Sequence, residues 1–163
     1  MDAALAMAAA VRSHQAAAEL LRDGQAEQSF WWDDADTGLR CKCRPDWLNG
    51  ATVIDLKTTT DASPAGFAKS CATFRYHVQA SHYLAGLPAE RFIFIAVEKV
   101  YPYAVGVYQL AGIFMFITLM LSHFVISLLK HRPYSWSPQQ HIRQKLNLRL
   151  LLNCPKTKYG LYG

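Results

Sequence analysis

The sequence predicts an α/β (α+β) fold with a central mixed β-sheet flanked by helices. Three observations lead to this prediction. Apolar and charged residues alternate over residues 39–44, which is typical of a strand with one buried face. Residues 92–97 are apolar at every position, which indicates a fully buried strand. Residues 3–22 and 75–84 have the composition or spacing of helices.

In the first half, the expected order is one helix followed by three strands. The helix occupies residues 3–22 and ends before Gly24, a helix-capping residue. The first strand is 27–32, and the turn-forming residues 33–38 connect it to the second strand, 39–44, in a hairpin in which Gly38 can adopt a positive φ. A turn at residues 49–50 leads into the third strand, 52–58, whose Val53 and Ile54 enter the core.

In the second half, helices precede two further strands. Ser63 and Pro64 are typical of a helix start, as the capping residue and the first helical residue. Helical spacing continues through Phe67 and again over 75–84, and Gly86 and Pro88 end it. The strands 92–97 and 103–110 follow, separated by a turn at residues 101–102.

Charge divides the chain into two parts. The 163 residues are 52% apolar and 18% charged, which suits one folded domain and excludes a disordered composition. All 12 acidic residues lie in residues 1–110, which carry a net charge of −2, whereas 111–163 hold no acid and carry +7. We therefore expect a domain over 1–110 and a divergent apolar and basic tail over 111–163. The overall charge of +5 says nothing about what the first part binds.

The tail begins with an apolar stretch over residues 111–129. It has no formal charge and a single histidine, His123, and basic residues follow it. This length suits a transmembrane helix, although His123 argues against one, and the alternatives are a buried helix or a segment not selected to fold with the rest. We expect neither a signal peptide at the start nor a disulfide framework among the four cysteines. We expect a cytoplasmic location, with membrane anchoring through 111–129 as the alternative.

Three residues of the third strand and its approach carry the chemistry. Asp46 and Asp55 lie at a strand end and within the next strand, where adjacent strands can bring both carboxylates to one Mg²⁺ ion. Lys57 leaves the same strand face as Asp55, because side chains alternate along a strand. A lysine beside a metal-bound water can stabilise negative charge developing on a phosphate. This set is suited to cleaving a phosphodiester.

Two further groups extend this candidate site. Gln79 and Tyr83 are four residues apart, on one face of the second-half helix. The basic residues of the hairpin, Arg40, Lys42 and Arg44, share one strand face. They are either solvated side chains or phosphate contacts along DNA, and we favour DNA contacts because of the neighbouring acidic residues. Cys41 and Cys43 are half of a zinc pattern without a second pair, and on a strand both face the core.

The motif order resembles a known nuclease superfamily. Pro45-Asp46, then Asp55-Leu56-Lys57, with Gln79-x-x-x-Tyr83 downstream, is similar to the PD-(D/E)XK nucleases in their RecB-like branch. The sequence around these motifs, over residues 37–46, 55–59 and 76–79, resembles the RecE-type exonucleases (exodeoxyribonuclease VIII). The likeness runs from about His14 to Leu110. The resemblance implies a restriction-endonuclease-like core and a prophage-encoded recombination nuclease.

The resemblance also assigns roles. It makes Asp46 and Asp55 metal ligands, Lys57 the catalytic lysine, and Gln79 and Tyr83 the supporting pair. Glu27 lies where many relatives keep an acidic residue near the metal, and we expect it to be a third metal ligand. Such enzymes use Mg²⁺, with Mn²⁺ as an expected substitute, and degrade double-stranded DNA from the 5′ end. They act as ring-shaped homo-oligomers, and we expect a recombination partner protein.

The chain departs from this family in two places. Relatives have a histidine ligand well upstream of the first aspartate, whereas this chain offers only His14, which we interpret as a surface residue of the first helix. The acidic, helical C-terminal part of the family is missing after Leu110. Two alternatives to an active exonuclease therefore stay open: an inactive truncated remnant of such a nuclease, and a membrane-anchored protein of unknown function.

Overall fold

A computed structural model provides the structure of the chain and describes residues 2–110. Two helices and two pairs of short strands come first, and a long strand, two helices and two strands follow. The elements in chain order are α1 (Ala3–Ser13), α2 (Gln15–Leu20), β1 (Gln25–Ala26), β2 (Phe30–Asp33), β3 (Arg40–Cys43), β4 (Trp47–Asn49), β5 (Thr52–Thr59), α3 (Pro64–Phe74), α4 (Tyr76–Gly86), β6 (Arg91–Glu98) and β7 (Val105–Gln109).

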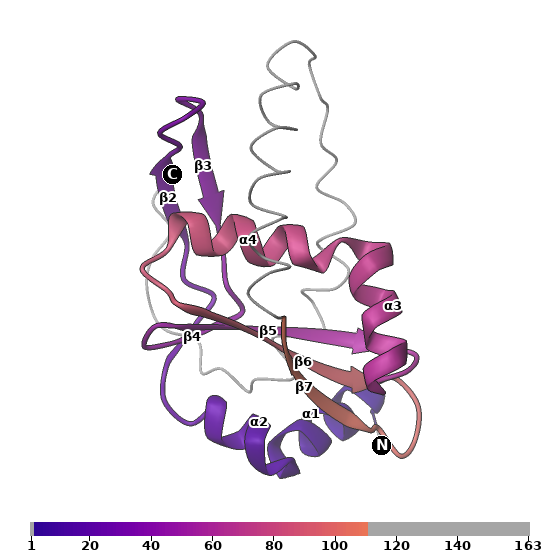
Figure 1. Cartoon of the computed structure of the whole chain (residues 1–163). Coiled ribbons are helices and arrows are strands. Elements are labelled where there is room, and N and C mark those ends of the chain that lie inside the picture. The colour runs from indigo at the N-terminus through magenta and orange to yellow at the C-terminus, as the bar shows by residue number, and fades with distance from the viewer. Residues whose placement is uncertain (1, 111–163) are drawn as a thin grey trace.

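Five strands form the main sheet in the order β1-β4-β5-β6-β7. Strands β5 and β6 are parallel, and the other neighbours are antiparallel, so the sheet is mixed. Helices α1 and α2 cover one face of the sheet, and α3 and α4 connect β5 to β6 over the other face (Figure 1). The predicted fold class is therefore confirmed.

The two sheet faces bury separate clusters of apolar side chains. Along β6, alternate residues enter opposite clusters: Phe92 and Phe94 pack with α3 and α4, whereas Ile93 and Ile95 pack with α1 and α2. Residues 92–97 of this strand are all apolar because both of its faces are covered. Strand β5 follows the same alternation, with Val53 on the α3–α4 side. Odd-numbered residues of β5 therefore face α3 and α4.

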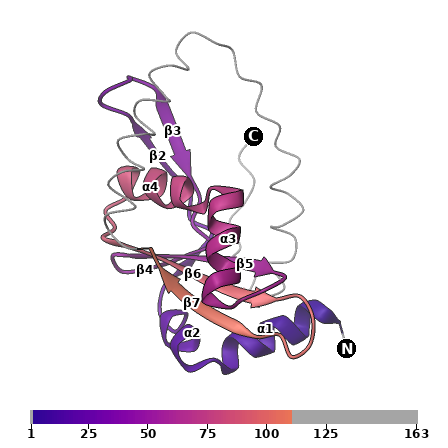
Figure 2. The same ribbon diagram turned by 45° about the vertical axis from the view of Figure 1, so that its right-hand side comes forward.

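The hairpin of β2 and β3 forms a sheet of its own. Cross-strand pairs run from Phe30 with Cys43 to Asp33 with Arg40, which confirms the predicted hairpin. Its turn holds Gly38 at φ 67°, as predicted, and the Asp34 carboxylate accepts the Thr37 amide at 2.9 Å. The hairpin extends beyond α4, on the side away from the main sheet (Figure 2).

Two predicted elements differ from the structure, and two short strands of the structure are not predicted. The first helix is divided at His14, whose extended backbone ends α1 and whose Nδ1 caps α2 by accepting the Ala17 amide. The first strand starts at Phe30 instead of residue 27, because Glu27 adopts a left-handed conformation. Strands β1 and β4 are not predicted, since two or three residues are too few to give a periodic signal.

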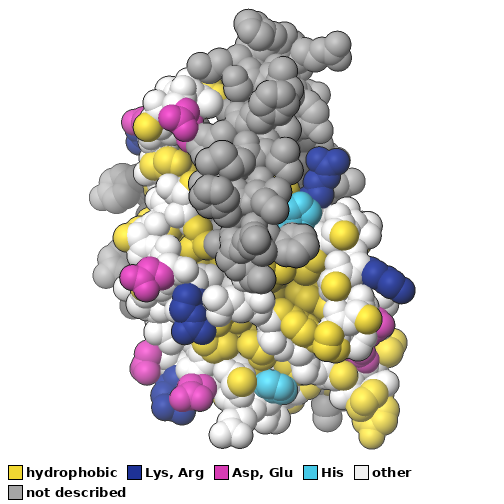
Figure 3. All heavy atoms as spheres, viewed as in Figure 1, with side chains coloured by type: hydrophobic (Ala, Val, Ile, Leu, Met, Phe, Trp, Pro, Cys, Tyr) yellow, Lys and Arg dark blue, Asp and Glu magenta, His cyan; other side chains and the backbone are white. Residues whose placement is uncertain are grey.

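Surface charge and apolar surface are mixed on the described part of the chain. In the view of Figure 3, the described Lys and Arg side chains are scattered among acidic and hydrophobic ones. None of the helices within residues 2–110 has the length and apolar character to cross a membrane. The predicted span 111–129 lies outside the described residues.

Candidate active site

Strand β5 directs the two key side chains of the predicted motif to one place. Asp55 and Lys57 are odd-numbered residues of β5, so they point toward the α3–α4 layer with Val53. Gln79 reaches them from α4, which crosses above this face of the sheet. The parallel crossover from β5 to β6 thus places the helical part of the motif over its strand part.

These three side chains form a closed set of polar contacts. Lys57 Nζ lies 2.5 Å from Asp55 Oδ2 and donates to Gln79 Oε1 at 2.9 Å. Gln79 Nε2 donates in turn to Asp55 Oδ1 at 2.7 Å. Asp55 is 2% and Lys57 8% exposed, so the ion pair is almost fully removed from water. Apart from the lysine contact, Asp55 Oδ2 is a buried oxygen without a hydrogen-bond partner among the described residues.

Asp46 joins this site through β4 instead of through the hairpin strand that precedes it in sequence. It directly precedes β4, which pairs antiparallel with β5, whereas β3 lies in the separate hairpin. Its Oδ2 accepts the backbone amide of Leu56 at 3.0 Å, and the residue is 8% exposed. Asp46 and Asp55 are therefore both buried beside the same segment of β5. The expected meeting of adjacent strands occurs, but the strand that supplies it is β4.

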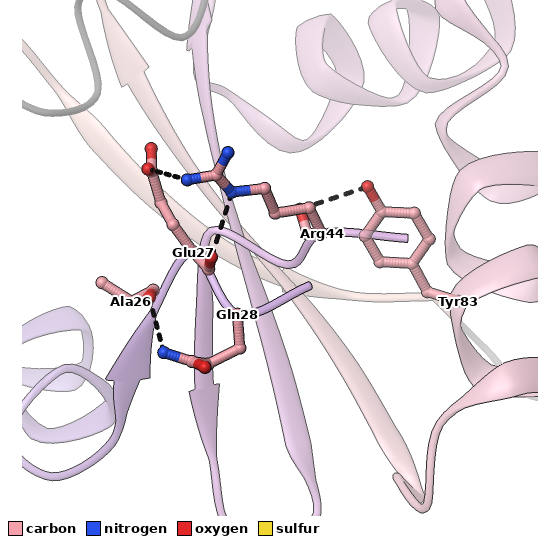
Figure 4. Close-up of polar contacts among 5 residues, drawn as sticks. All are labelled: Ala26, Glu27, Gln28, Arg44 and Tyr83. Carbon is pink, nitrogen blue, oxygen red and sulfur yellow. Dashed lines mark hydrogen bonds and ion pairs between the residues drawn. The ribbon is translucent and has the colours of Figure 1, made fainter. Parts of the chain in front are cut away.

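Glu27 and Arg44 lie beside Asp46 and bind each other. The Glu27 amide donates to the Asp46 carbonyl at 3.1 Å. Arg44 Nη2 is 2.6 Å from Glu27 Oε2, and Arg44 Nε donates to the Glu27 carbonyl at 3.0 Å (Figure 4). On the other side, the Tyr83 hydroxyl donates to the Arg44 carbonyl at 3.4 Å. The segment before Asp46 is thus held between α4 and the loop that follows β1.

The electrostatics of the site keep two groups protonated at neutral pH. Burial lowers the pKa of the Lys57 ammonium, but the Asp55 carboxylate, aided by Asp46, raises it by more, so the pKa lies above its ordinary value. Burial, with the charge of Asp55, raises the pKa of the Tyr83 hydroxyl to about 12. Lys57 is therefore a cation and Tyr83 a hydrogen-bond donor.

Tyr76 is a member of the site that the sequence analysis did not identify. The Lys57 Nζ lies 4.7 Å from the centre of its ring, a cation–π contact. Tyr76 is buried at the start of α4 and stacks on Phe94. The signal that could have revealed it is its position three residues before Gln79, on the same helix face.

The remaining predicted residues lie elsewhere. Arg40 and Lys42 are exposed on the projecting hairpin, where Arg40 pairs with Asp33 at 3.0 Å. His14 belongs to the α1–α2 layer, on the face of the sheet opposite to that of Asp55. Within residues 2–110, no three His, Cys, Asp or Glu side chains form a group that could hold a metal ion. The three described cysteines, Cys41, Cys43 and Cys71, are free thiols.

A comparison with known protein families identifies the family of this chain. Residues 1–130 match a PDDEXK-like domain of unknown function, DUF3799. The chain belongs to the DUF3799 family. The PD-(D/E)XK superfamily predicted from the motif order is thus confirmed, whereas the relation to RecE-type exonucleases stays a prediction. The DUF3799 match continues past Leu110, where the charge composition changes.

A solved structure with a TM-score of 0.52 agrees with this fold. The DUF3799 chain is similar to a putative exonuclease from Eubacterium rectale with a TM-score of 0.52 and 13% identity, over 83% of this chain and 51% of that one. It also matches the crystal structure of SSO0001 at a TM-score of 0.45 and 17% identity, over 94% of this chain and 66% of that one. This chain spans about half the length of the Eubacterium protein. No match was found among curated proteins.

Proposed function

We propose that this DUF3799 domain is a nuclease that hydrolyses DNA phosphodiester bonds with a divalent cation, Mg²⁺ or Mn²⁺. The observation that carries the proposal is the buried contact set of Asp55, Lys57 and Gln79 beside Asp46. Burying an ion pair costs desolvation free energy that its attraction often fails to recover, so stability alone is a poor reason for it. Membership of a PDDEXK-like family supports a nuclease function for the same residues.

The donor set fits a hard divalent cation. Asp46 and Asp55 are the residues that would hold it, since both are buried carboxylates and, apart from the Lys57 contact, Asp55 Oδ2 has no hydrogen-bond partner among the described residues. Mg²⁺ is usually held by one or two carboxylates together with water and substrate phosphate, so two acids suffice. When bound, such a cation polarises a phosphoryl oxygen and lowers the pKa of water.

Lys57 and its neighbours supply the remaining chemistry. The ammonium stays charged at neutral pH, so Lys57 opposes negative charge on the phosphate and does not act as a general base. Gln79 and the Tyr76 ring hold the ammonium from two sides, which limits the positions that it can take. Tyr83 remains a donor that holds the Arg44 carbonyl. The basic side chains Arg40 and Lys42 extend the proposed DNA contacts along the hairpin.

The finer features of the proposal come from the sequence resemblance. We propose double-stranded DNA as substrate, digestion from the 5′ end, and a RecE-type role in recombination. A homo-oligomer and a recombination partner protein belong to the same proposal. The name of the Eubacterium protein, a putative exonuclease, supports an activity that begins at DNA ends.

A nuclease assay on the full chain tests the proposal. Linear duplex DNA labelled at the 5′ or the 3′ end is incubated with Mg²⁺, with Mn²⁺ or with a chelator, and closed circular duplex serves as the substrate without ends. We expect digestion of linear DNA alone, dependent on the divalent cation, with early release of the 5′ label. Digestion of the closed circular duplex would show that the activity is that of an endonuclease and not of an exonuclease.

Two variants connect that activity to the site. Lys57→Ala should lower the cleavage rate by about 10²–10³, the scale for losing one preorganised charged group. Asp55→Asn should lower both cleavage and Mg²⁺ affinity. Lys69→Ala changes an exposed lysine of α3 and serves as the matched control, with parent activity expected. If the parent protein cleaves no DNA under any condition, the inactive remnant is the correct interpretation.

A further inference from the structure

Glu27 has a backbone conformation that its residue type does not favour. It lies between β1 and β2 at a φ of 53°, in the left-handed region that non-glycine residues rarely adopt. A strained conformation persists only when the surrounding contacts enforce it, and such residues cluster at functional sites. Three hydrogen bonds that can enforce it lead to the segment from Arg44 to Asp46.

Three polar groups of Glu27 form hydrogen bonds with that segment. Its amide donates to the Asp46 carbonyl, and its carbonyl and carboxylate both accept from the Arg44 guanidinium. The left-handed turn allows Glu27 to direct its carbonyl and side chain to Arg44 (Figure 4), while its amide donates to Asp46. The Glu27 side chain is 16% and the Arg44 side chain 41% exposed, so the pair is partly shielded from water. Such pairs bind more strongly than fully exposed ones.

The segment that this pair holds ends at the Asp46 carboxylate. Pro45 fixes one backbone angle between Arg44 and Asp46, so movement at Arg44 is transmitted to Asp46. Asp46 Oδ2 then accepts the Leu56 amide, which lies between Asp55 and Lys57 on β5. The placement of Asp46 against β5 thus depends on Arg44 at one end and on Leu56 at the other.

We infer that Glu27 and Arg44 form a positioning pair that fixes the Asp46 carboxylate against β5. The pair acts through the backbone of Asp46 and binds neither the cation nor DNA. The Glu27 carboxylate already faces a guanidinium at 2.6 Å, and two of the guanidinium nitrogens are bound to Glu27. This inference deepens the proposed function, because the residue that the pair places is one of the two proposed cation ligands.

The test measures the Leu56 amide by hydrogen exchange with NMR detection, in the full chain without divalent cation. The Leu56 amide reports directly on Asp46, since its partner is the Asp46 carboxylate. Arg44→Ala and Glu27→Ala should each speed its exchange, by about tenfold for the loss of one held hydrogen bond. The double variant should exchange no faster than Arg44→Ala alone, because the two residues act as one unit.

Controls separate positioning from general weakening. The amide of Ile95 is buried in the centre of β6, so its exchange reports on global unfolding. In every variant, the exchange rate of Ile95 should change only as much as the global unfolding free energy changes. Glu27→Gln retains an acceptor for Arg44 and should stay within about threefold of the parent rate at Leu56. Glu19→Gln and Arg22→Ala make matched charge changes at exposed residues of the preceding segment and should leave Leu56 unchanged.

The outcomes decide the inference without any nuclease activity. If the Leu56 amide keeps its protection in Arg44→Ala and Glu27→Ala, or changes only together with Ile95, the pair does not position Asp46. Calorimetric Mn²⁺ titration adds a second decision. A larger loss of Mn²⁺ affinity in Glu27→Gln than in Arg44→Ala would make Glu27 a ligand and overturn the inference. A parent chain that cleaves no DNA counts against the proposed function alone, since the exchange measurement needs no substrate.

Discussion

A single oxygen atom, Asp55 Oδ2, is the centre of the site at the scale of residues. The ammonium of Lys57 is its partner at 2.5 Å, and the oxygen has no other hydrogen-bond partner among the described residues. If the proposed divalent cation were held by this oxygen, its charge would replace the compensation that Lys57 provides. Lys57 is then available to interact with substrate phosphate while Gln79 and Tyr76 keep it nearby.

Lys57→Ala should therefore show a cation-dependent loss of stability. Without divalent cation, the variant leaves the Asp55 carboxylate buried and uncompensated, which costs about 3–5 kcal/mol of unfolding free energy. Mg²⁺ should raise the melting temperature of this variant more than that of the parent, because the added charge replaces the lost ammonium. Thermal unfolding with and without Mg²⁺ measures both effects, with Lys69→Ala as control. Equal Mg²⁺ shifts in Lys57→Ala and the parent would exclude Asp55 Oδ2 as a cation ligand.

Tyr76 should matter through its ring and not through its hydroxyl. Tyr76→Phe keeps a face for the Lys57 ammonium, and its cleavage rate should stay within about twofold of the parent. Tyr76→Leu loses a contact of about 0.5–2 kcal/mol, so kcat should fall by about three- to thirtyfold while KM changes little. Steady-state kinetics on linear duplex DNA, at a temperature where urea unfolding shows both variants folded, measures the difference. Equal kcat values for the two variants would mean that the ring does not position Lys57.

At the scale of elements, the hairpin depends on a close approach to α4. Gly86, the last residue of α4, leaves no room for a side chain: a Cβ there would lie 2.2 Å from the Trp32 ring. Trp32 also packs on His82 of the same helix, with ring centres 4.9 Å apart. The hairpin therefore packs against α4 through Trp32, together with Phe30 and Cys43 in the core cluster, and its exposed face carries Arg40 and Lys42.

Gly86→Ala should destabilise the domain even though alanine favours helix. Helix propensity alone predicts a gain of about 1 kcal/mol. The collision with Trp32 should outweigh it, with a net loss of about 1–3 kcal/mol typical of overpacking. Urea unfolding followed by tryptophan fluorescence measures the change, and Ala85→Gly at the exposed neighbouring position calibrates the propensity contribution. A Gly86→Ala variant more stable than the parent would show that the hairpin adjusts at no cost.

The elements also show what the sequence can predict. The shared face of Asp55 and Lys57 follows from strand alternation, and the Gly38 turn follows from residue type, so both were predictable. The pairing of Glu27 with Arg44 was not, because the two residues are 17 positions apart and meet only through the left-handed turn at Glu27. The strand that brings Asp46 close to Asp55 was not predicted, because β4 is too short to give a recognisable pattern in the sequence.

At the scale of the whole molecule, a buried thiol makes the stability of the fold decrease at alkaline pH. Cys43 packs in the core cluster beneath α3 and α4, and burial raises the pKa of its thiol from 9.0 to about 11. Below pH 9 the thiol is neutral in the folded and the unfolded chain. Between pH 9 and 11 the unfolded chain ionises first, so this contribution to stability declines over that range.

Cys43→Ala should therefore change the pH dependence of stability as well as its size. The variant should be less stable than the parent by a constant amount below pH 9, because it leaves a small cavity. Between pH 9 and 11 the difference should shrink, since the parent alone loses the thiol contribution. Urea unfolding at intervals from pH 7 to 11 measures both curves. Parallel curves over the whole range would show that the Cys43 thiol has its ordinary pKa in the folded chain.

The bond from the Leu56 amide to the Asp46 side chain also bears on folding fidelity. Beyond the Trp47–Ile54 pair, β4 offers no further backbone partner to β5, and the aspartate carboxylate takes that place. A slip of β4 by one residue would move this carboxylate away and leave a buried amide unpaired. A correctly registered sheet and a correctly placed acid are thus selected together while the chain folds. Loss of activity in Asp46→Ala would then have two sources, whereas Asp46→Asn, which keeps an oxygen for the amide, isolates the charge.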